Sequence, residues 1–412
     1  MKEFIKNSEA YTGRPTTKFM RMFYGGNYGL VFSDFWKSQR RFLLHVLREL
    51  GVGKSVLEGV VIDYANEMTE TLRQLNGEPI DMMKMLTTVV GNIVHKLTFG
   101  WTVPLESDYI IDIRNRMQEI IDMTSHPMKF LMQIWDGFRI LDPLFNGIIK
   151  ECLKKNDVII NDIRKEIKKH RDTIDYNSEP RDYIDAFLME QRRQKEEIES
   201  DGEWSDKQLI GAVYDLFGGA IDTTPTSIKG FLLYMVNYPE VQNKIHEEID
   251  REIGRERNIT MSDQAKLPYL QACIQELQRI FIPFSLNTQH MTTEDVVIGG
   301  YKLPKGTVII PQFHSVHFDE YHFNDPERFD PTRHLDTEGR FVKDNKIIPF
   351  SLGKRVCPGE NVARVGMFLI IANLFQKFKF KEEIDGKYSD IRSVSKILCS
   401  PDSFYTRVIY RG

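Results

Sequence analysis

Cysteine is scarce in this sequence: the chain of 412 residues has only four, at positions 152, 273, 357 and 399. The four are widely spaced and include no CxxC pair. Disulfide frameworks and zinc sites need paired or closely spaced cysteines, so the sequence predicts neither. We therefore expect the protein to work in a reducing compartment.

Long hydrophobic runs and a large charge of one sign are lacking as well. The longest apolar stretch lies within residues 367–375, the length of a buried helix, and residues 1–7 resemble neither a signal peptide nor a membrane anchor. We expect no membrane-spanning helix in the chain as written. The net charge of −4 gives no argument for nucleic-acid binding, and 41% hydrophobic with 28% charged residues is typical of a globular protein with a substantial core.

Helical periodicity covers most of the sequence, and strand signals occur in one region. The expected helices span residues 239–253, 269–280 and 360–377, with a longer one over 207–236 that Gly218-Gly219 and Pro225 interrupt. The expected strands span residues 296–298, 301–303 and 307–310, joined by Gly/Pro turns in a small sheet. The sequence thus predicts a mainly α fold with a small β region late in the chain.

The stretch FSLGKRVCPGE surrounds one of the rare cysteines, Cys357. Pro358 suits the first turn of the helix that follows, so the sulfur should lie at a helix N-terminus, where N–H groups and the dipole favour a thiolate. Gly353 and Gly359 would let a large flat ligand approach, and Arg355 could pair with its carboxylate. A structural cysteine beside a turn is the alternative, but the spacing FxxGxRxCxG favours a thiolate ligand for haem iron.

An acid and a base three residues apart, Glu276 and Arg279, share one face of the expected helix over 269–280. The simplest interpretation is an exposed ion pair that contributes less than about 1 kcal/mol. The sequence PERF at 326–329 favours a second interpretation, in which Arg328 joins them in a buried triad. Such a triad is costly to break, and it would brace the loop that presents Cys357.

Two polar residues, Asp222 and Thr223, interrupt an otherwise apolar helix. Pro225 cannot donate a hydrogen bond to the carbonyl of Ile221 and should distort the helix there. One interpretation is a solvated kink. The other is proton delivery during oxygen activation, with the carboxylate supplying protons to the hydroxyl.

Together these motifs resemble those of the cytochromes P450, which are haem-thiolate monooxygenases, and most closely the microsomal animal enzymes. The resemblance covers nearly the whole chain and implies a single domain over residues 1–412 with haem b as cofactor. It implies that Cys357 is the axial iron ligand, with Gly359 beside it, and that Thr223 and Asp222 activate oxygen. The implied propionate contacts are Trp36 and Arg40 in FWKSQRRF, His290 in NTQHMTTED, and Ser351 and Arg355.

The chain departs from the family pattern in three places. Gly219-Ala220 reverses the usual Ala-Gly order, and Pro225 stands where serine is common. Residues 1–15 match a segment that normally lies well inside the chain. We therefore expect the membrane anchor, the hinge, the first helix and the first two strands to be absent, which leaves folding and activity open.

The resemblance implies that one oxygen atom of O2 is inserted into a lipophilic substrate such as a steroid, a fatty acid or a xenobiotic. Electrons would come from NADPH through NADPH–cytochrome P450 reductase, with cytochrome b5 as a second candidate partner. The full-length type lies on the cytosolic face of the endoplasmic reticulum membrane, and this chain would be soluble or peripheral. The alternatives are a non-catalytic haem-binding protein and an inactive truncated fragment.

Three further surfaces have two interpretations each. Phe281, Ile282, Phe284 and Leu286 either line a substrate pocket or belong to the core. The apolar segment 128–138 either contacts a membrane or packs internally. The third set comprises Lys37, Arg40, Arg41 and Arg48. These cations either form a basic face for an acidic redox partner or belong to an ordinary solvated helix face.

Overall fold

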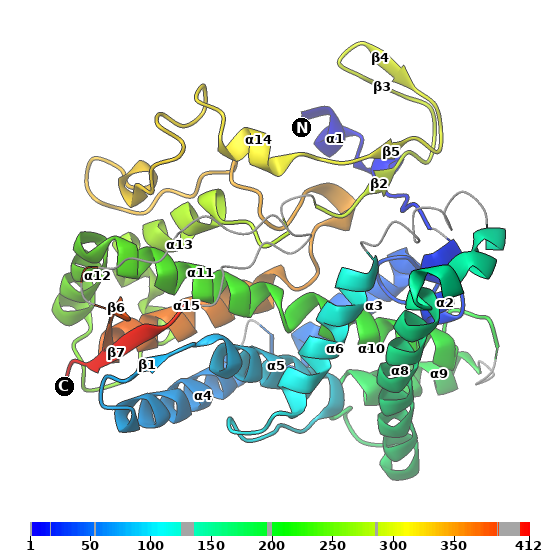
Figure 1. Cartoon of the computed structure of the whole chain (residues 1–412), viewed down its shortest axis with the longest axis horizontal. Helices are drawn as coiled ribbons and strands as arrows, with labels where there is room; N and C mark the ends of the chain where they lie inside the picture. Colours follow the sequence, from blue (N-terminus) through cyan, green and yellow to red (C-terminus); the bar gives the residue numbers. More distant parts are fainter. Residues whose placement is uncertain are drawn as a thin grey trace. The chain divides into compact units, whose positions relative to one another are not determined.

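Helices dominate the computed structural model, which describes residues 2–16, 18–52, 55–124, 136–195, 200–284, 287–384, 386 and 404–412. The strands within these residues are short and form three small sheets (Figure 1). The expectation of a mainly α fold with a small β region is confirmed. The chain divides into two compact units: unit 1 comprises Met1–Gly13, Val52–Val90 and Asp222–Gly412, and unit 2 comprises Arg14–Gly51 and Gly91–Ile221.

Unit 1 contains most of the residues that the sequence singles out. Its α-helices are α1 (Lys2–Lys6), α4 (Ser55–Gln74), α11 (Thr223–Asn237), α12 (Pro239–Glu252), α13 (Pro268–Ile280), α14 (Phe313–His317) and α15 (Glu360–Lys377). Its 3₁₀ turns are η1 (Ser8–Tyr11), η3 (Met261–Lys266), η4 (Pro331–His334) and η5 (Gly353–Arg355). The helix α5 (Met83–Phe99) begins in unit 1 and ends in unit 2.

The helix starts in unit 1 have local causes. Pro239 and Pro268 open α12 and α13, where a residue without an N–H loses nothing. Glu248 on α12 then accepts hydrogen bonds from the backbone N–H groups of Tyr269 and Leu270, at 2.8 and 3.0 Å, and so caps α13 from a neighbouring helix. The predicted helices over 239–253, 269–280 and 360–377 are confirmed within one residue.

The strands described in unit 1 are β1 (Pro79–Ile80), β2 (His290–Met291), β3 (Val296–Ile298), β4 (Tyr301–Leu303), β5 (Val308–Ile309), β6 (Phe378–Glu382) and β7 (Thr406–Tyr410). β7 lies between β1 and β6 (Figure 1). β3 and β4 form a hairpin whose turn residues Gly299 and Gly300 both have positive φ, as a tight two-residue turn requires. β5 does not join this hairpin but pairs with β2, so the expectation of one sheet for these strands is wrong.

The core of unit 1 packs α15 against α4, α12 and β6 (Figure 1). Phe375 on α15 contacts Phe231 edge-on at 5.4 Å between ring centroids and Phe380 of β6 at 5.1 Å. All three rings are buried. These ring contacts hold the C-terminal end of α15, the helix whose N-terminus follows the Cys357 turn.

The helices that the structure describes in unit 2 are α2 (Lys18–Tyr24), α3 (Trp36–Glu49), α6 (Tyr109–Thr124), the 3₁₀ segment η2 (Asp136–Phe145), α8 (Ile148–Thr173), α9 (Tyr183–Gln194) and α10 (Asp206–Ala220). α8 lies beside α6 (Figure 1). Asp215 on α10 is partly buried, and its carboxylate accepts hydrogen bonds from the Tyr24 hydroxyl and from the N–H groups of Leu30 and Val31. Burial raises its pKa to about 6, against the opposing effect of those donors.

The long helix predicted over 207–236 is two helices. α10 ends at Ala220 and α11 begins at Thr223, so the interruption lies at Ile221-Asp222, between the glycine pair and the proline. Pro225 occupies the first turn of α11, where its missing N–H costs nothing. Within the described residues, no helix combines the length and the apolar character that crossing a bilayer requires.

Candidate active site

Cys357 lies at the end of a tight turn that leads into α15. Its backbone N–H donates to the carbonyl of Phe350 at 2.9 Å, which closes the turn over η5. Gly359 is the N-cap residue and α15 starts at Glu360, so Pro358 precedes the helix instead of opening it. Cys357 is exposed, whereas Cys152 and Cys273 are buried. The turn thus presents a sulfur at a helix N-terminus, as predicted, but two residues earlier relative to the helix.

The two glycines of the motif serve different purposes. Gly353 has φ +74°, and a Cβ there would lie 3.0 Å from the Cβ of Ser8, so a side chain would be strained by backbone and neighbour alike. A Cβ on Gly359 would meet the Cys357 Sγ at 3.8 Å, an ordinary contact. The sequence predicted that both glycines make room for a flat ligand. At Gly353 the structure gives another reason for glycine, namely a left-handed backbone conformation packed closely against Ser8.

The N-terminal segment holds two predicted propionate contacts in place. Arg355 Nε donates to the carbonyl of Thr12 at 2.9 Å. His290 is buried, and its Nδ1 donates to the carbonyl of Tyr11 at 2.7 Å. Successive carbonyls of one short segment therefore orient a guanidinium and an imidazole from two distant parts of the sequence.

Ser351 offers a test of whether the residues present fit the predicted cofactor. Its φ is +70°, and its Oγ is buried with no hydrogen-bond partner among the residues that the structure describes. A buried hydroxyl without a partner is costly, so it points to a polar group that the protein itself does not supply. With Arg355 four residues away and Cys357 two further on, the segment fits a ligand that carries carboxylates and is bound through a thiolate.

The oxygen-activating pair and the remaining propionate contacts lie elsewhere in the chain. Asp222 is the buried N-cap residue of α11, and Thr223 is the first residue of the same helix. Trp36 and Arg40 lie in unit 2, at the start of α3 and one turn later, and are both partly buried on one helix face. Their roles in cofactor binding stay predictions.

The predicted ion pair of Glu276 and Arg279 is fully buried. Arg279 donates two hydrogen bonds to the carboxylate, from Nε at 2.9 Å and from Nη2 at 2.8 Å, and both side chains are 0% exposed. Burial alone would raise the pKa of Glu276, but the hydrogen bonds from Arg279 and His334 outweigh it and lower the pKa to about 2. The interpretation as an exposed surface pair is wrong.

The third member of the predicted triad is a different arginine. Arg328 is exposed and contributes only its backbone carbonyl, which accepts from Arg279 Nη2 at 3.2 Å. Arg333 on η4 lies 3.4 Å from the Glu276 carboxylate, and His334 Nε2 donates to it at 2.9 Å. η4 packs against α13, which brings these two side chains inward and leaves Arg328 outside.

His317, which the sequence did not single out, connects this cluster to the turn. Arg279 Nη1 donates to the His317 carbonyl at 2.7 Å, and the His317 ring lies between the Arg279 carbonyl at 3.1 Å and the Ile348 N–H at 3.0 Å. The side chain is fully buried, and burial lowers its pKa to about 4. The only local signal was a histidine in the short helical segment FHSVH.

The apolar residues predicted to line a substrate pocket are partly accounted for by the core. Ile282 is buried against Phe313, Ile348 and Leu352. Phe281 is also buried, with its ring against Gly230 of α11, which has no room for a Cβ. Phe284 is partly buried. Leu286, residues 125–135 and residues 387–403, with Cys399, lie outside the described residues.

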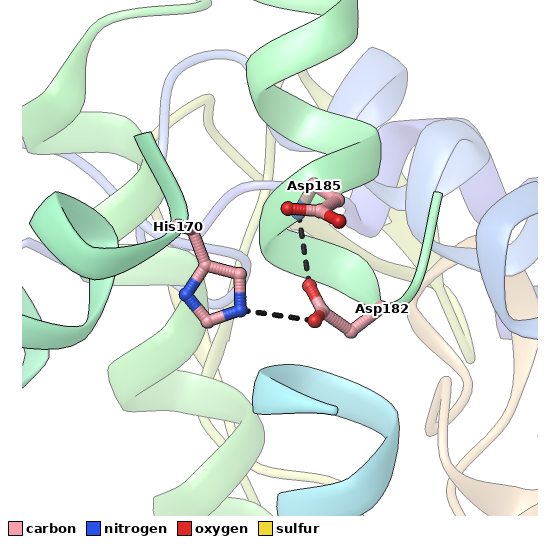
Figure 2. A group of neighbouring side chains, drawn as sticks. All are labelled: His170, Asp182 and Asp185. Atoms are coloured by element: carbon pink, nitrogen blue, oxygen red, sulfur yellow. Dashed lines mark hydrogen bonds and ion pairs between the residues drawn. The ribbon is translucent and has the colours of Figure 1, made fainter. Parts of the chain in front are cut away.

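A second polar cluster lies in unit 2, where His170, Asp182 and Asp185 come close enough together to suggest a metal site (Figure 2). His170 Nδ1 donates to the Glu166 carbonyl at 2.7 Å and Nε2 donates to Asp182 at 2.9 Å. Both ring nitrogens therefore carry protons and have no lone pair for a metal. Asp185 is occupied by Arg181, so this cluster is a buried ion pair that joins α8 to α9.

Comparison with known proteins agrees with these motifs. A sequence model of the family Cytochrome P450 matches residues 1–408. The chain belongs to the cytochrome P450 family. It is similar to the probable cytochrome P450 CYP36A1 of Caenorhabditis elegans, with 37% identity over 100% of this chain and 84% of the relative. It is also similar to cytochrome P450 2C5 of Oryctolagus cuniculus, with 36% identity over 94% of this chain and 78% of the relative, and to cytochrome P450 2C29 of Mus musculus, with 34% identity over 95% and 79%.

Membership in the P450 family establishes the general chemistry. The protein is a P450 monooxygenase whose cofactor is haem held by a cysteine thiolate, and it acts on a small molecule with electrons from a redox partner.

Besides Arg333, His334 and His317, sequence reasoning missed Arg14, a partly buried cation in the sequence TGRP. Burial lowers the pKa of Arg14 to about 10. A partly buried cation two residues after Thr12 is a further candidate for recognising a carboxylate.

Proposed function

We propose that Cys357 is the thiolate ligand of the haem iron in this P450. The observation that carries the proposal is the closed turn from Phe350 to Cys357, which presents an exposed sulfur and also includes the buried Ser351 hydroxyl and Arg355. Haem supplies the redox chemistry that splits O2 once it is bound there. Arg355, His290 and Ser351 would hold its propionates, and by resemblance Trp36 and Arg40 would do the same within one domain over 1–412.

The reduced carbonyl complex tests this ligand assignment. Thiolate ligation gives a strongly red-shifted Soret band, and we expect Cys357→Ala to abolish that band. The matched controls, which should each retain the red-shifted band, are Cys152→Ala, Cys273→Ala and Cys399→Ala. For Cys273 the reason is visible, since burial raises the pKa of its thiol well above its usual range and keeps it protonated. A wild-type spectrum from Cys357→Ala would disprove the assignment.

We propose further that Thr223 and Asp222 deliver protons during the reaction, in which one oxygen atom enters a lipophilic substrate and the other leaves as water. Two electrons and two protons are consumed per turnover. Asp222 is buried at the N-cap of α11, next to the Thr223 hydroxyl in the sequence, where it can hold a proton for the hydroxyl. Thr223→Ala should keep haem binding but yield less product and more peroxide per NADPH.

The matched control for Thr223 is Thr71→Ala. The Thr71 hydroxyl is bonded to the Glu67 carbonyl of its own helix, α4, so its loss should leave the coupling ratio unchanged. An unchanged ratio in Thr223→Ala would return this residue to a structural role. If the wild-type chain binds haem but never oxidises NADPH with a reductase, the protein is a non-catalytic haem-binding protein.

We propose NADPH–cytochrome P450 reductase as the redox partner, with cytochrome b5 as a second one. Lys37, Arg41 and Arg48 are exposed on one face of α3, which supports docking of an acidic partner. Electron transfer to such a face should slow as ionic strength rises. Replacement of all three cations by glutamine should remove this salt dependence, whereas an unchanged dependence would place the docking face elsewhere.

We propose that the chain makes peripheral contact with the endoplasmic reticulum membrane on its cytosolic side. Ile140 and Leu144 on η2 are 82% and 78% exposed and lie four residues apart in the sequence. Large apolar side chains are costly to expose to water. A lipophilic substrate would partition into the same membrane. Ile140→Asp together with Leu144→Asp should weaken cosedimentation with phospholipid vesicles, and equal cosedimentation would exclude η2 as the contact.

A further inference from the structure

His317 is fixed in one protonation state by its two ring contacts. A carbonyl oxygen can only accept a hydrogen bond and a backbone N–H can only donate one. Nδ1 must therefore carry the proton that it donates to the Arg279 carbonyl, and Nε2 must be the acceptor for the Ile348 N–H. The ring is thus a neutral bridge with one defined tautomer and no exposed surface.

The end of the bridge on α13 is rigid. Arg279 Nη1 donates to the His317 carbonyl at 2.7 Å, so the backbone and the side chain of His317 both contact the same arginine. Arg279 is in turn held by two hydrogen bonds to the buried Glu276. Any movement of His317 would have to disturb a fully buried ion pair, which is costly.

The other end of the bridge leads into the Cys357 turn. The Ile348 carbonyl accepts from the Ser351 N–H at 3.3 Å, and two residues after Ile348 the Phe350 carbonyl accepts from the Cys357 N–H at 2.9 Å. The Ile348 side chain is buried against Ile282 and Phe313. The Ile348 N–H is therefore the backbone anchor directly before the turn, and without Nε2 it would be a buried donor with no acceptor.

We propose that His317 is a positioning residue for Cys357: it holds the start of the 348–357 turn on α13 through Nε2 and thereby sets where the sulfur lies. This inference rests on the proposed role of Cys357 as the iron ligand. His317 touches neither the cofactor nor the substrate, and it acts through Ile348.

Two substitutions of His317 separate its two contacts. His317→Gln can place an amide oxygen near the Nε2 position and retain the acceptor for Ile348. His317→Asn can place an amide N–H near the Nδ1 position, which retains the donor to Arg279 but leaves Ile348 unpaired. We expect the asparagine variant to convert a large part of the reduced carbonyl complex from the red-shifted thiolate band to the band of a protonated or displaced sulfur, and to shift the haem reduction potential. The glutamine variant should stay close to wild type in both.

Amide hydrogen exchange of the segment 346–352 gives a readout that does not depend on haem. In His317→Asn the exchange should accelerate up to about tenfold, the factor expected when a hydrogen bond of ordinary strength is lost, and in His317→Gln it should change little. His314→Asn is the matched control, because His314 lies on the same helix α14 but is exposed. It should leave exchange, spectrum and potential unchanged.

Several results would overturn the inference. Equal losses in the asparagine and glutamine variants would mean that His317 only fills space. Faster exchange in His317→Asn with an unchanged spectrum and potential would show that Ile348 does not control the sulfur. If both variants fail to fold, amide exchange of the wild-type chain tests the inference instead. Segment 346–352 should exchange far more slowly than an exposed loop, and exchange at the rate of an exposed loop would contradict the anchoring role of His317. If the wild-type chain never shows a thiolate band while exchange responds as expected, the ligand assignment fails and the His317–Ile348 contact stands.

Discussion

Two buried histidines, one in each unit, differ in charge: His170 is protonated on both ring nitrogens and His317 is neutral. His170 in unit 2 donates from both nitrogens, to a carbonyl and to the Asp182 carboxylate. Burial alone would lower its pKa, but the hydrogen bond to Asp182 and the charge of that carboxylate outweigh burial and raise the pKa. His317 in unit 1 meets a carbonyl and an amide N–H, and burial lowers its pKa to about 4.

The difference shows that the atoms in contact with a buried imidazole decide its charge. Burial by itself only makes the charged form less favourable. A carboxylate makes the charged form of His170 the stable one and produces an ion pair between α8 and α9 (Figure 2). An amide donor excludes the charged form of His317, because a protonated Nε2 could not accept from Ile348. The His170–Asp182 contact is stable only while His170 is charged, and the His317–Ile348 contact is stable only while His317 is neutral.

The strongest test of the comparison is Glu276→Gln, which removes the anion beneath Arg279. The arginine cannot lose its proton and would stay buried as an uncompensated charge, so we expect a loss of about 3–5 kcal/mol in the free energy of unfolding. Asp182→Asn in unit 2 should cost less, about 1–3 kcal/mol, because His170 can shed its proton and asparagine still caps α9. Denaturant unfolding of both variants measures the difference.

The matched control is Asp336→Asn, which breaks a salt bridge of 2.8 Å with Arg340 on the surface. Its arginine is 69% exposed, so the cost should be the smallest of the three. Equal costs for Glu276→Gln and Asp182→Asn would mean that the two clusters do not differ in the way their charges suggest.

The second test is pH, because the two histidines respond in separate windows. The folded-state pKa of His317 is lowered from 6.5 to about 4, so its contribution is present above pH 6.5 and is lost as pH falls, on the order of 2 kcal/mol by pH 5. The folded-state pKa of His170 is raised, so its contribution is fully present below pH 6.5 and is lost as pH rises through the folded value. The protection factors of hydrogen exchange should therefore fall at α13–α14 as pH drops below 6.5 and at α8–α9 as pH rises above 6.5.

Variants separate these two windows. His317→Gln should flatten the acid response of α13–α14 without affecting α8–α9, and His170→Gln should do the reverse on the alkaline side. His246, whose pKa burial also lowers to about 4, adds to the acid sensitivity of unit 1 and is unaffected by either change. A response of both regions in the same pH window would contradict the assigned charges.

The smallest expected effect separates the two arginines near Glu276. Arg333→Ala removes a cation 3.4 Å from the buried carboxylate and should lower the unfolding free energy by about 1 kcal/mol or more. Arg328→Ala removes only an exposed side chain, keeps the carbonyl that Arg279 uses, and should change it by less than about 0.5 kcal/mol. The thermal midpoints of the two variants measure this difference. A lower midpoint for Arg328→Ala than for Arg333→Ala would show that the Arg328 side chain belongs to the cluster.

The sequence by itself determined the helices α12, α13 and α15, the β3–β4 hairpin and the cysteine at the start of α15. Each of these depends on residues close together in the chain: prolines at helix starts, paired glycines in a turn, and periodic apolar positions. The pairing of Glu276 with Arg279 was also visible, since three residues on a helix bring side chains to one face.

Only the tertiary structure decided the features that depend on distant segments. PERF at 326–329 drew attention to Arg328, but the packing of η4 on α13 places Arg333 and His334 against Glu276 instead. Pro225 predicted a distortion near Ile221, but only the folded chain shows that α10 ends there and a separate helix, α11, begins at Thr223. Likewise, no local pattern distinguishes His317 from His170, because a histidine's charge is set by the groups that folding places against its two nitrogens, a carboxylate in one unit and a backbone amide in the other.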